Sequence, residues 1–203
     1  MKIIKSPSII KAWKHAIKAI KIAGNRVKDE DVNLVELFNL FLSITNPRVD
    51  DKLKELNPEM HDWMKANFEE KILVPELKNA KSYGYRLRDH NGKDQVKWVV
   101  EKLKKKRETK SATITTLMPS EDEGYIPCVS LLDFKIRDDI LIVTVTCRSL
   151  DFGKKAIYNL LELTKIGEKI KTECKVKDLL LNVHVISAHI YEDDLEKLEA
   201  MDI

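Results

Sequence analysis

Two segments rich in Val, Ile and Thr, Cys128–Ile136 and Ile140–Arg148, constrain the fold of this chain most strongly. Such residues are typical of strands, and only the polar sequence Arg137-Asp138-Asp139 separates the two segments. Because so short a connection joins antiparallel neighbours, the two segments are predicted to form a β-hairpin. The segments Ser111–Leu117 and Leu179–Tyr191 predict further strands.

Helical periodicity dominates the remaining sequence. Ser8–Ala23 is predicted to be an amphipathic helix, with Ser8 as its N-cap and Gly24 as its stop. Apolar residues cover most of the circumference of Val32–Ile44, which is therefore predicted to be a buried helix that Pro47 ends. Further helices are predicted over Met60–Phe68, Asp94–Lys106, Lys154–Lys171 and Asp193–Met201. The expected fold is α+β, with residues 1–203 forming a single domain in which helices flank a mixed β-sheet.

The composition excludes several classes of protein. Of the 203 residues, 43% are hydrophobic, which argues against disorder. The net charge of +3 is spread along the chain, and a dedicated nucleic-acid binder usually has a larger, clustered excess. The sequence contains no apolar run long enough to span a bilayer, and Met1–Lys5 lacks a signal-peptide core. We therefore expect a cytoplasmic protein with neither a membrane nor a nucleic acid as its partner.

The three cysteines are Cys128, Cys147 and Cys174, and their odd number and wide spacing do not predict disulfides. No CxxC pair is present, so no metal site is expected. A free cysteine in a strand is most often a small buried apolar residue. Cys128, however, is predicted to lie at the open end of the hairpin beside Arg148, and a nearby cation favours a reactive thiolate. The same guanidinium could bind a phosphate.

Other polar residues leave alternatives open. His184 and His189 are separated by an odd number of positions on one predicted strand, so they should face opposite sides and not share a metal ion. His189 and Tyr191 share a face that could bind a sugar hydroxyl, or the imidazole could simply be satisfied by backbone groups. Glu36 is either a functional carboxylate or part of a solvent-facing edge. The basic run Lys104–Arg107 is best interpreted as a solvated helix end.

From Tyr125 to Tyr191 the sequence resembles the thymidylate synthase family. The matching elements, in the family's order, are Pro127-Cys128, Arg148-Ser149-x-Asp151, Asn159 and His189-Ile190-Tyr191. Arg148 follows Cys128 by 20 residues, Asn159 follows after 11 more, and His189 after a further 30. In the first half, Glu36-Leu37 with Thr45-Asn46 resembles the family's segment carrying a catalytic glutamate, and His61-Asp62-Trp63 and Tyr83-Gly84 resemble its cofactor side more faintly. The short chain and divergent first half resemble the archaeal branch.

The resemblance implies a methyltransferase that forms dTMP from dUMP through a covalent adduct between Cys128 and pyrimidine C6. It implies a reduced-pterin one-carbon donor, either methylene-tetrahydrofolate or methylene-tetrahydromethanopterin, and no metal. Glu36 would be the general acid/base, and Asp151 would lie near the pterin or an ordering water. The implied substrate-binding residues are Arg148 and Ser149 for the phosphate, Asn159 for the pyrimidine edge, and His189 with Tyr191 for the ribose.

Departures from the family pattern leave several points open. Val129 stands where the family has a histidine. Glu108-Thr109-Lys110-Ser111 replaces two adjacent arginines that cross the dimer to bind phosphate, so a homodimer is the family default and a monomer stays possible. Before Asn159, the segment Phe152–Tyr158 replaces the family's pattern Leu-Gly-x-Pro-Phe. The family's N-terminal arginine loop, which grips the phosphate, has only Arg26 as a weak candidate here. Only 12 residues follow Tyr191 here, whereas typical members of the family continue much further, into a C-terminal arm that closes over the folate. Ile203 resembles the apolar residue at the end of that arm. From this we hypothesise a methanopterin-type donor.

Two alternative functions follow from the same residues. The first is deoxycytidylate hydroxymethylase, a sister enzyme with the same nucleophile. Those enzymes are expected to have aspartate in place of Asn159, because cytosine presents an amino donor where uracil presents O4. Asn159 therefore favours uracil. The second alternative is a non-catalytic relative that binds nucleotides or RNA.

Overall fold

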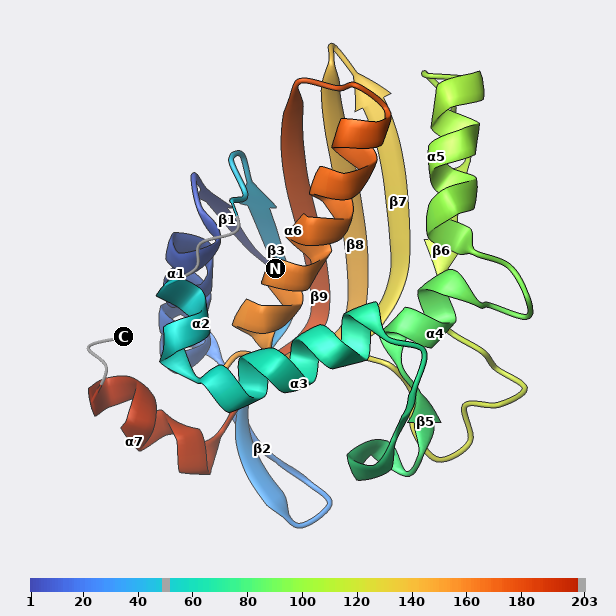
Figure 1. The fold of residues 1–203 in the computed structure, drawn as a ribbon. Helices are drawn as coiled ribbons and strands as arrows, with labels where there is room; N and C mark the ends of the chain where they lie inside the picture. Colours follow the sequence, from blue (N-terminus) through green and yellow to red (C-terminus); the bar gives the residue numbers. More distant parts are fainter. Residues whose placement is uncertain (49–51, 201–203) are drawn as a thin grey trace.

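The computed structural model describes residues 1–48 and 52–200, which form an α+β structure around a seven-stranded mixed sheet (Figure 1). The strands of this sheet are β1 (Lys2–Ser6), β2 (Asn25–Asp29), β3 (Val32–Ile44), β6 (Ala112–Thr115), β7 (Val129–Arg137), β8 (Ile140–Asp151) and β9 (Asp178–Tyr191). The helices are α1 (Ile9–Ala23), α2 (Lys52–Leu56), α3 (Pro58–Glu69), α4 (Tyr83–Arg88), α5 (Gln95–Lys105), α6 (Ala156–Glu173) and α7 (Glu192–Ala200). A short ribbon of β4 (Leu73–Val74) and β5 (Ala80–Lys81) encloses a single 3₁₀ turn, η1 (Pro75–Leu77).

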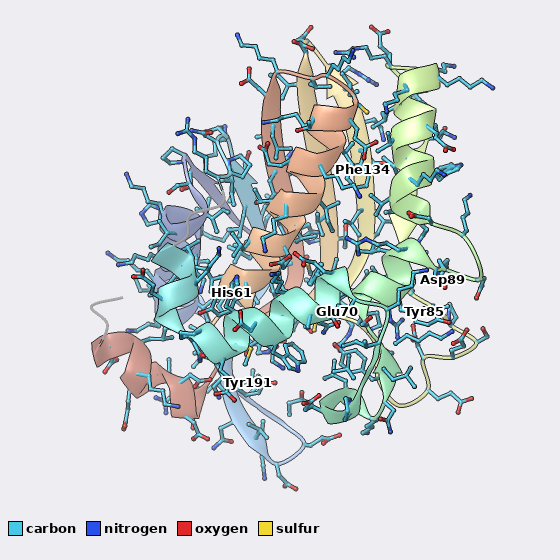
Figure 2. All side chains as sticks on the ribbon, viewed as in Figure 1. His61, Glu70, Tyr85, Asp89, Phe134 and Tyr191 are labelled. Carbon is cyan, nitrogen blue, oxygen red and sulfur yellow. The ribbon has the colours of Figure 1, made fainter. Side chains whose placement is uncertain are left out.

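The strands lie in the order β1-β3-β9-β8-β7-β6, and β2 pairs with the first part of β3. The pairs β1–β3 and β8–β9 are parallel and the others are antiparallel, so the sheet is mixed as predicted. Helices α1, α5 and α6 pack on one face of the sheet (Figure 1). Side chains fill the space beneath them (Figure 2), among them the fully buried Phe134. None of the helices in the described ranges is both long enough and apolar enough to cross a membrane.

Helix α1 begins and ends as predicted. The Ser8 side chain caps it by accepting a hydrogen bond from the Lys11 N–H, and the Gly24 N–H bonds the Ile20 carbonyl at its end. The indole N–H of Trp13 donates a 2.9 Å bond to the Phe152 carbonyl, which ties this helix to the turn after β8. The predicted helices over residues 60–68, 94–106, 154–171 and 193–201 are confirmed as α3, α5, α6 and α7, within a few residues at each end. Met201, the last residue of the fourth, lies outside the described residues.

The prediction of a helix over Val32–Ile44 is wrong, because this segment is strand β3, which lies between β1 and β9. A strand is expected to alternate apolar and polar residues, but β3 does not. Asn39 adopts a left-handed backbone conformation, with φ +56°, and it separates a buried pair, Leu34 and Val35, from the later buried residues Leu40, Leu42 and Ile44. With 13 residues, β3 is also longer than most strands. The predicted helical Glu36 therefore lies on a strand.

The predicted hairpin is confirmed as the antiparallel pair β7–β8. Asp138 and Asp139 both have positive φ, 48° and 60°, the conformation of a two-residue turn whose twist matches that of the strands. Near the open end the register shifts: Leu131 pairs with Thr146, but Val129 pairs with Cys147. The chain therefore contains one extra residue between these two pairs, a β-bulge.

The bulge decides which residue lies opposite Arg148. Beyond it, the Arg148 N–H donates a 2.8 Å hydrogen bond to the carbonyl of Cys128. If the register of the first seven pairs of the hairpin continued with no bulge, Val129 would lie opposite Arg148. The predicted proximity of Cys128 and Arg148 therefore holds, and a local irregularity that the sequence analysis did not foresee produces it.

Candidate active site

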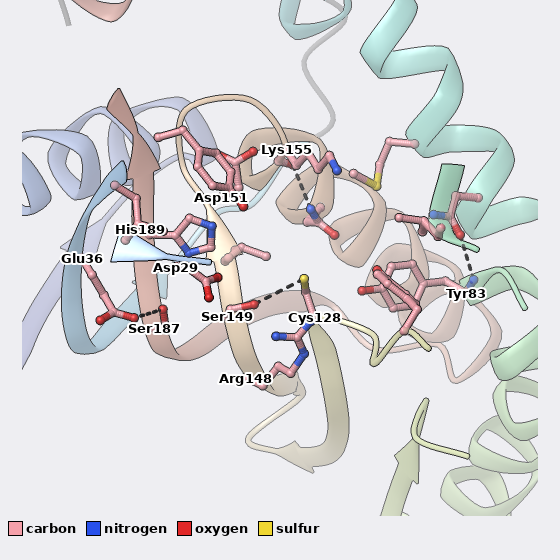
Figure 3. A pocket seen from close by; sticks show the side chains of 18 of the residues that line it. Asp29, Glu36, Tyr83, Cys128, Arg148, Ser149, Asp151, Lys155, Ser187 and His189 are labelled. Carbon is pink, nitrogen blue, oxygen red and sulfur yellow. Dashed lines mark hydrogen bonds between the residues drawn. The ribbon is translucent and has the colours of Figure 1, made fainter. Parts of the chain in front are cut away.

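One cavity of about 560 Å³ collects every site residue predicted from the sequence. It lies where β3, β8 and β9 meet the N-terminal end of α6, the segment before β7 and one face of α3 (Figure 3). The predicted residues that line it are Glu36, Cys128, Arg148, Ser149, Asp151, Asn159, His189 and Tyr191. Such a volume is within the usual range of small-molecule sites.

Cys128 is half-buried and lies in this cavity, so its thiol is accessible to a ligand. The Ser149 hydroxyl donates toward the Cys128 Sγ across 3.5 Å. The Arg148 guanidinium lies on the same side of the cavity (Figure 3), and its Nε and Nη2 atoms donate to the Ile126 carbonyl at 3.1 and 2.7 Å. These two bonds hold the guanidinium in place on the segment that leads into β7.

Three charged or titratable side chains form a row across neighbouring strands. Glu36 of β3 pairs in register with His189 of β9, and His189 pairs with Asp151 of β8. The Ser187 hydroxyl donates to the Glu36 carboxylate. The ring of Tyr191 lies edge-on to that of His189, with their centroids 5.2 Å apart. The row therefore presents two carboxylates and an imidazole to one wall of the cavity.

Burial shifts the protonation of Asp151 and His189 toward their neutral forms. Burial raises the pKa of the Asp151 carboxyl, and the nearby His189 and two backbone donors oppose this shift. Those donors are the N–H groups of Gly153 and Lys154, which bond one Asp151 oxygen at 2.9 and 3.2 Å. Burial lowers the pKa of His189, with Asp151 opposing. Burial thus favours the neutral carboxyl of Asp151 and the neutral imidazole of His189.

Asn159 reaches the cavity from the first turn of α6 and is almost fully buried. Its Nδ2 donates a 2.9 Å bond to the Lys155 carbonyl. A carboxamide has two N–H donors and one acceptor oxygen, so this bond fixes the amide plane while a donor and an acceptor remain. Such a pair matches a ring edge that offers one acceptor beside one N–H.

Several residues of the cavity were not singled out as site residues from the sequence. Tyr125 and Tyr83 lie beside Cys128, and the Tyr83 hydroxyl accepts a 3.0 Å bond from the Val129 N–H. Burial raises the pKa of Tyr83 well above its ordinary value. Lys155 and Ser187 also line the cavity. Periodicity could have identified both, since Lys155 precedes Asn159 by one helical turn and Ser187 precedes His189 by two strand positions.

Other residues considered in the sequence lie elsewhere. Cys147 and Cys174 are buried in the core. His184 lies on the opposite face from His189, as predicted, and its ring stacks on Phe41 with centroids 4.1 Å apart. Arg26 is exposed, 3.8 Å from a Glu192 carboxylate oxygen, and does not line the cavity.

The basic run at the end of α5 forms surface ion pairs. Lys104 lies 3.6 Å from Glu173, and Arg107 lies 2.7 Å from Asp139. This agrees with the interpretation as a solvated helix end. Within the described residues, no three His, Cys, Asp or Glu side chains gather in a way that could hold a metal ion.

Comparison with known proteins places this geometry in context. The thymidylate synthase family model matches residues 40–201, which include the cavity residues from Trp63 onward and begin just after Glu36. A protein of Methanococcoides burtonii is 33% identical over 209 residues, covering 98% of this chain and 93% of its own length. A protein of Methanothermobacter thermautotrophicus is 32% identical, and the match covers 97% of this chain and 96% of that protein. A protein of Methanocaldococcus jannaschii is 34% identical, and the match covers 94% of this chain and 90% of that protein.

Each of these three relatives bears the name "Putative thymidylate synthase". The similarity extends over nearly the whole chain, and the family model alone spans well over half of it. The chain belongs to the thymidylate synthase family.

Proposed function

We propose that this protein forms dTMP from dUMP by adding the Cys128 thiolate to pyrimidine C6 and transferring a one-carbon unit to C5. One observation carries the proposal: Cys128, Arg148 and Asn159 share a single cavity. These are a nucleophile, a cation suited to a phosphate, and an amide suited to the edge of uracil. Covalent addition divides one difficult substitution into easier steps.

In the first step the sulfur forms a bond to C6. The electron pair of the C5–C6 double bond then moves toward C4, and O4 takes the negative charge, which makes C5 nucleophilic. Arg148 lies on the same side of the cavity as Cys128 (Figure 3), and a positive charge beside a sulfur in general stabilises a thiolate. Arg148 also binds the 5′-phosphate together with the Ser149 hydroxyl, since a guanidinium suits a phosphate geometrically.

Asn159 reads the pyrimidine by donating to O4 and accepting from N3–H. Its near-complete burial makes this recognition selective, because the wrong base would leave buried polar groups unpaired. His189 and Tyr191 bind the ribose 3′-hydroxyl. Glu36 and Asp151 serve the proton transfers at O4 and at the donor, and burial raises the pKa of Asp151, a direction that suits a general acid.

The one-carbon donor is a reduced pterin, and we propose the methanopterin type. When bound, this group supplies the methylene carbon and the reducing hydride. The cavity offers an aromatic and apolar wall for a flat ring, formed by Trp63 and Met64 of α3 and by Leu77. The relatives that align with this chain over almost their entire length are archaeal proteins. This similarity supports the methanopterin type of donor. We also propose that the protein works in the cytoplasm.

We propose a homodimer formed through the face of the sheet opposite α1, α5 and α6. On the central strands, exposed apolar residues on that face include Leu131 and Ile186, at 39% and 41% exposure. Large apolar side chains on an uncovered sheet face favour association with a matching surface. A second copy of this chain offers the same surface by symmetry.

The test is trapping of the covalent adduct. The protein is incubated with 5-fluoro-dUMP and either pterin donor, and its intact mass is measured. We expect a mass increase of one nucleotide plus donor, absent in Cys128→Ser and unchanged in Cys174→Ser, whose sulfur is buried away from the cavity. The absence of any adduct under both donor conditions would overturn the proposal.

A second measurement separates the pyrimidines. Release of tritium from C5 is followed with dUMP and dCMP separately. Release from dUMP alone is expected, because Asn159 complements uracil. Preferential release from dCMP would indicate a hydroxymethylase. Nucleotide binding without release from either substrate would indicate a non-catalytic relative.

A further inference from the structure

Lys155 places a positive charge in the cavity that the family resemblance does not account for, because it lies in the segment Phe152–Tyr158 that departs from the family pattern. The residue is half-buried and immediately precedes α6. Its carbonyl accepts both the backbone N–H of Asn159, at 3.0 Å, and the Asn159 Nδ2, at 2.9 Å. The residue that orients the pyrimidine-reading amide therefore also carries an ammonium group into the same space.

The ammonium of Lys155 lacks an ion-pair partner among the residues that the structure describes. Its Nζ lies over the ring of Trp63, 5.3 Å from the centroid, a contact of the cation–π type. The other two cations that line the cavity differ: Lys28 lies 3.5 Å from the Asp31 carboxylate, and Arg148 bonds the Ile126 carbonyl. A half-buried cation held only by an aromatic face is available to an anionic group of the substrate.

The proposed reaction creates such an anion on the side of the pyrimidine that faces Asn159. Addition of sulfur to C6 forms the S–C6 bond, shifts the double-bond electrons to C5, and leaves the negative charge on O4. The position after Cys128, where the family has a histidine, holds Val129, which is fully buried and whose side chain cannot donate a hydrogen bond. In Figure 3, Lys155 and Cys128 lie on different sides of the cavity, as expected for groups that act on O4 and on C6.

We propose that Lys155 is a catalytic residue whose ammonium donates a hydrogen bond to pyrimidine O4 and stabilises the enolate that forms when Cys128 adds to C6. This inference rests on the proposed function and adds to it a charge that the family pattern lacks. The Trp63 ring orients the ammonium in the free enzyme, and Asn159 holds the base within its reach. No proton is transferred in this step: the lysine remains an ammonium throughout, and its donor strengthens as charge develops on O4.

The test uses a reaction that needs addition at C6 but no pterin: replacement of the bromine of 5-bromo-dUMP by hydrogen, in which dithiothreitol is oxidised to its disulfide and bromide is released. Lys155→Met, which keeps the length of the side chain without its charge, is compared with Lys155→Arg and with Lys169→Met, which replaces an exposed lysine of α6. We expect Lys155→Met to lower the debromination rate constant roughly 100-fold, the usual effect of losing one such donor. Its KM for the nucleotide should change far less. Lys155→Arg should retain part of the rate, and Lys169→Met all of it.

The outcomes separate this inference from the proposed function. Debromination by the wild type with an equal rate in a folded Lys155→Met would overturn the role of Lys155 and leave the proposed function standing. A loss confined to pterin-dependent dTMP formation, with debromination unchanged, would also overturn it, because the lysine would then act on the donor. Debromination that is absent from the wild type, together with absent adduct formation, would instead overturn the proposed function. Thermal unfolding of each variant establishes that it is folded.

Discussion

The backbone N–H of Arg148 bonds the carbonyl of Cys128 at 2.8 Å, directly across the antiparallel pair β7–β8. This bond fixes the distance between the two peptide units that carry the proposed nucleophile and phosphate ligand. The Arg148 side chain is fixed separately, by its two bonds to the Ile126 carbonyl. Both backbone and side chain are therefore positioned before a nucleotide binds.

Replacing Arg148 with lysine should weaken nucleotide binding although the charge is kept. A lysine has one donor group and cannot reproduce the planar fork that bonds Ile126 while facing a phosphate. Hydrogen bonds to charged groups contribute about 1.5–3 kcal/mol each, so we expect KM for dUMP to rise about 10- to 100-fold. Arg137→Lys, at the turn end of the same hairpin, is the matched control and should leave KM unchanged. Equal KM values for wild type and Arg148→Lys would contradict the role of Arg148.

Asn159→Asp should change which pyrimidine reacts. A carboxylate accepts hydrogen bonds from the amino group of cytosine but repels O4 of uracil. Discrimination by buried hydrogen-bonding groups can be large, so we expect kcat/KM for dUMP to fall by about 100-fold or more and tritium release from dCMP to become detectable. Asn182→Asp, on the opposite face of the sheet, is the control. If the variant keeps the preference of the wild type for dUMP, the assignment of Asn159 fails.

The buried His189 should make folding stability depend on pH. Burial lowers the pKa of His189 below its usual value near 6.5. The unfolded chain therefore binds this proton first as the pH falls, so the contribution of His189 is present above about pH 6.5 and is lost as the pH falls through the folded pKa. Asp151, whose pKa burial raises, has the opposite sign, because its contribution is lost as the pH rises through its folded value.

The variant His189→Gln isolates the histidine. The stability that it loses on going from pH 7.5 to pH 5.5 should be smaller than that lost by the wild type. Urea unfolding at both pH values measures the two differences. A larger loss in the variant would show that the sign assigned to His189 is incorrect.

Gly153 should not tolerate a side chain. A Cβ at this position would lie 3.0 Å from the Asp194 Cβ and 3.2 Å from an Asp151 oxygen. Either α7 or the turn that bonds Asp151 must then move. We expect Gly153→Ala to lose about 1–3 kcal/mol of unfolding free energy, the usual range for overpacking, and also to lose activity. Gly124→Ala, where the nearest atom would lie at an ordinary 3.5 Å, should be close to neutral in urea unfolding.

The proposed dimer face can be disrupted by one charge. Ile186 lies on the uncovered face of the sheet and is 41% exposed. Ile186→Lys should convert a dimer into a monomer, because a desolvated lysine is costly in an apolar interface. Ile22→Lys, on α1 and 74% exposed, should not. Light scattering of the eluting protein measures the mass, and a wild type that is monomeric at micromolar concentration would refute the interface.

Much of the fold follows from the sequence because local signals are strong. Ser8 and Gly24 delimit α1 through capping chemistry, and the Asp138-Asp139 turn delimits the hairpin. The error over Val32–Ile44 has a tertiary cause: β3 lies between other strands, and the left-handed Asn39 disrupts the alternation by which a strand is recognised. The short β1 and β2, each of five residues, are formed by pairing with β3 and give little signal of their own.

The candidate site divides in the same way. Cys128, Arg148 and Asn159 belong to elements that the sequence predicts correctly, so their convergence could be anticipated. Glu36 was assigned to the wrong kind of element, yet it lies in the cavity because β3 pairs with β9 opposite His189. The position of Lys155 over Trp63 joins α6 to α3, a contact between elements distant in sequence that no local pattern reveals.

The extra residue between Val129 and Leu131 has a consequence for variation in this segment. Because the bulge absorbs one residue, deleting Ser130 would leave Cys128 opposite Arg148, but inserting one further residue beside Ser130 would place the isopropyl group of Val129, in place of a thiol, opposite that guanidinium. The thiol would move away from Arg148 although no residue of the site had been substituted. In this strand the number of residues, and not only their identity, determines whether the proposed chemistry can occur.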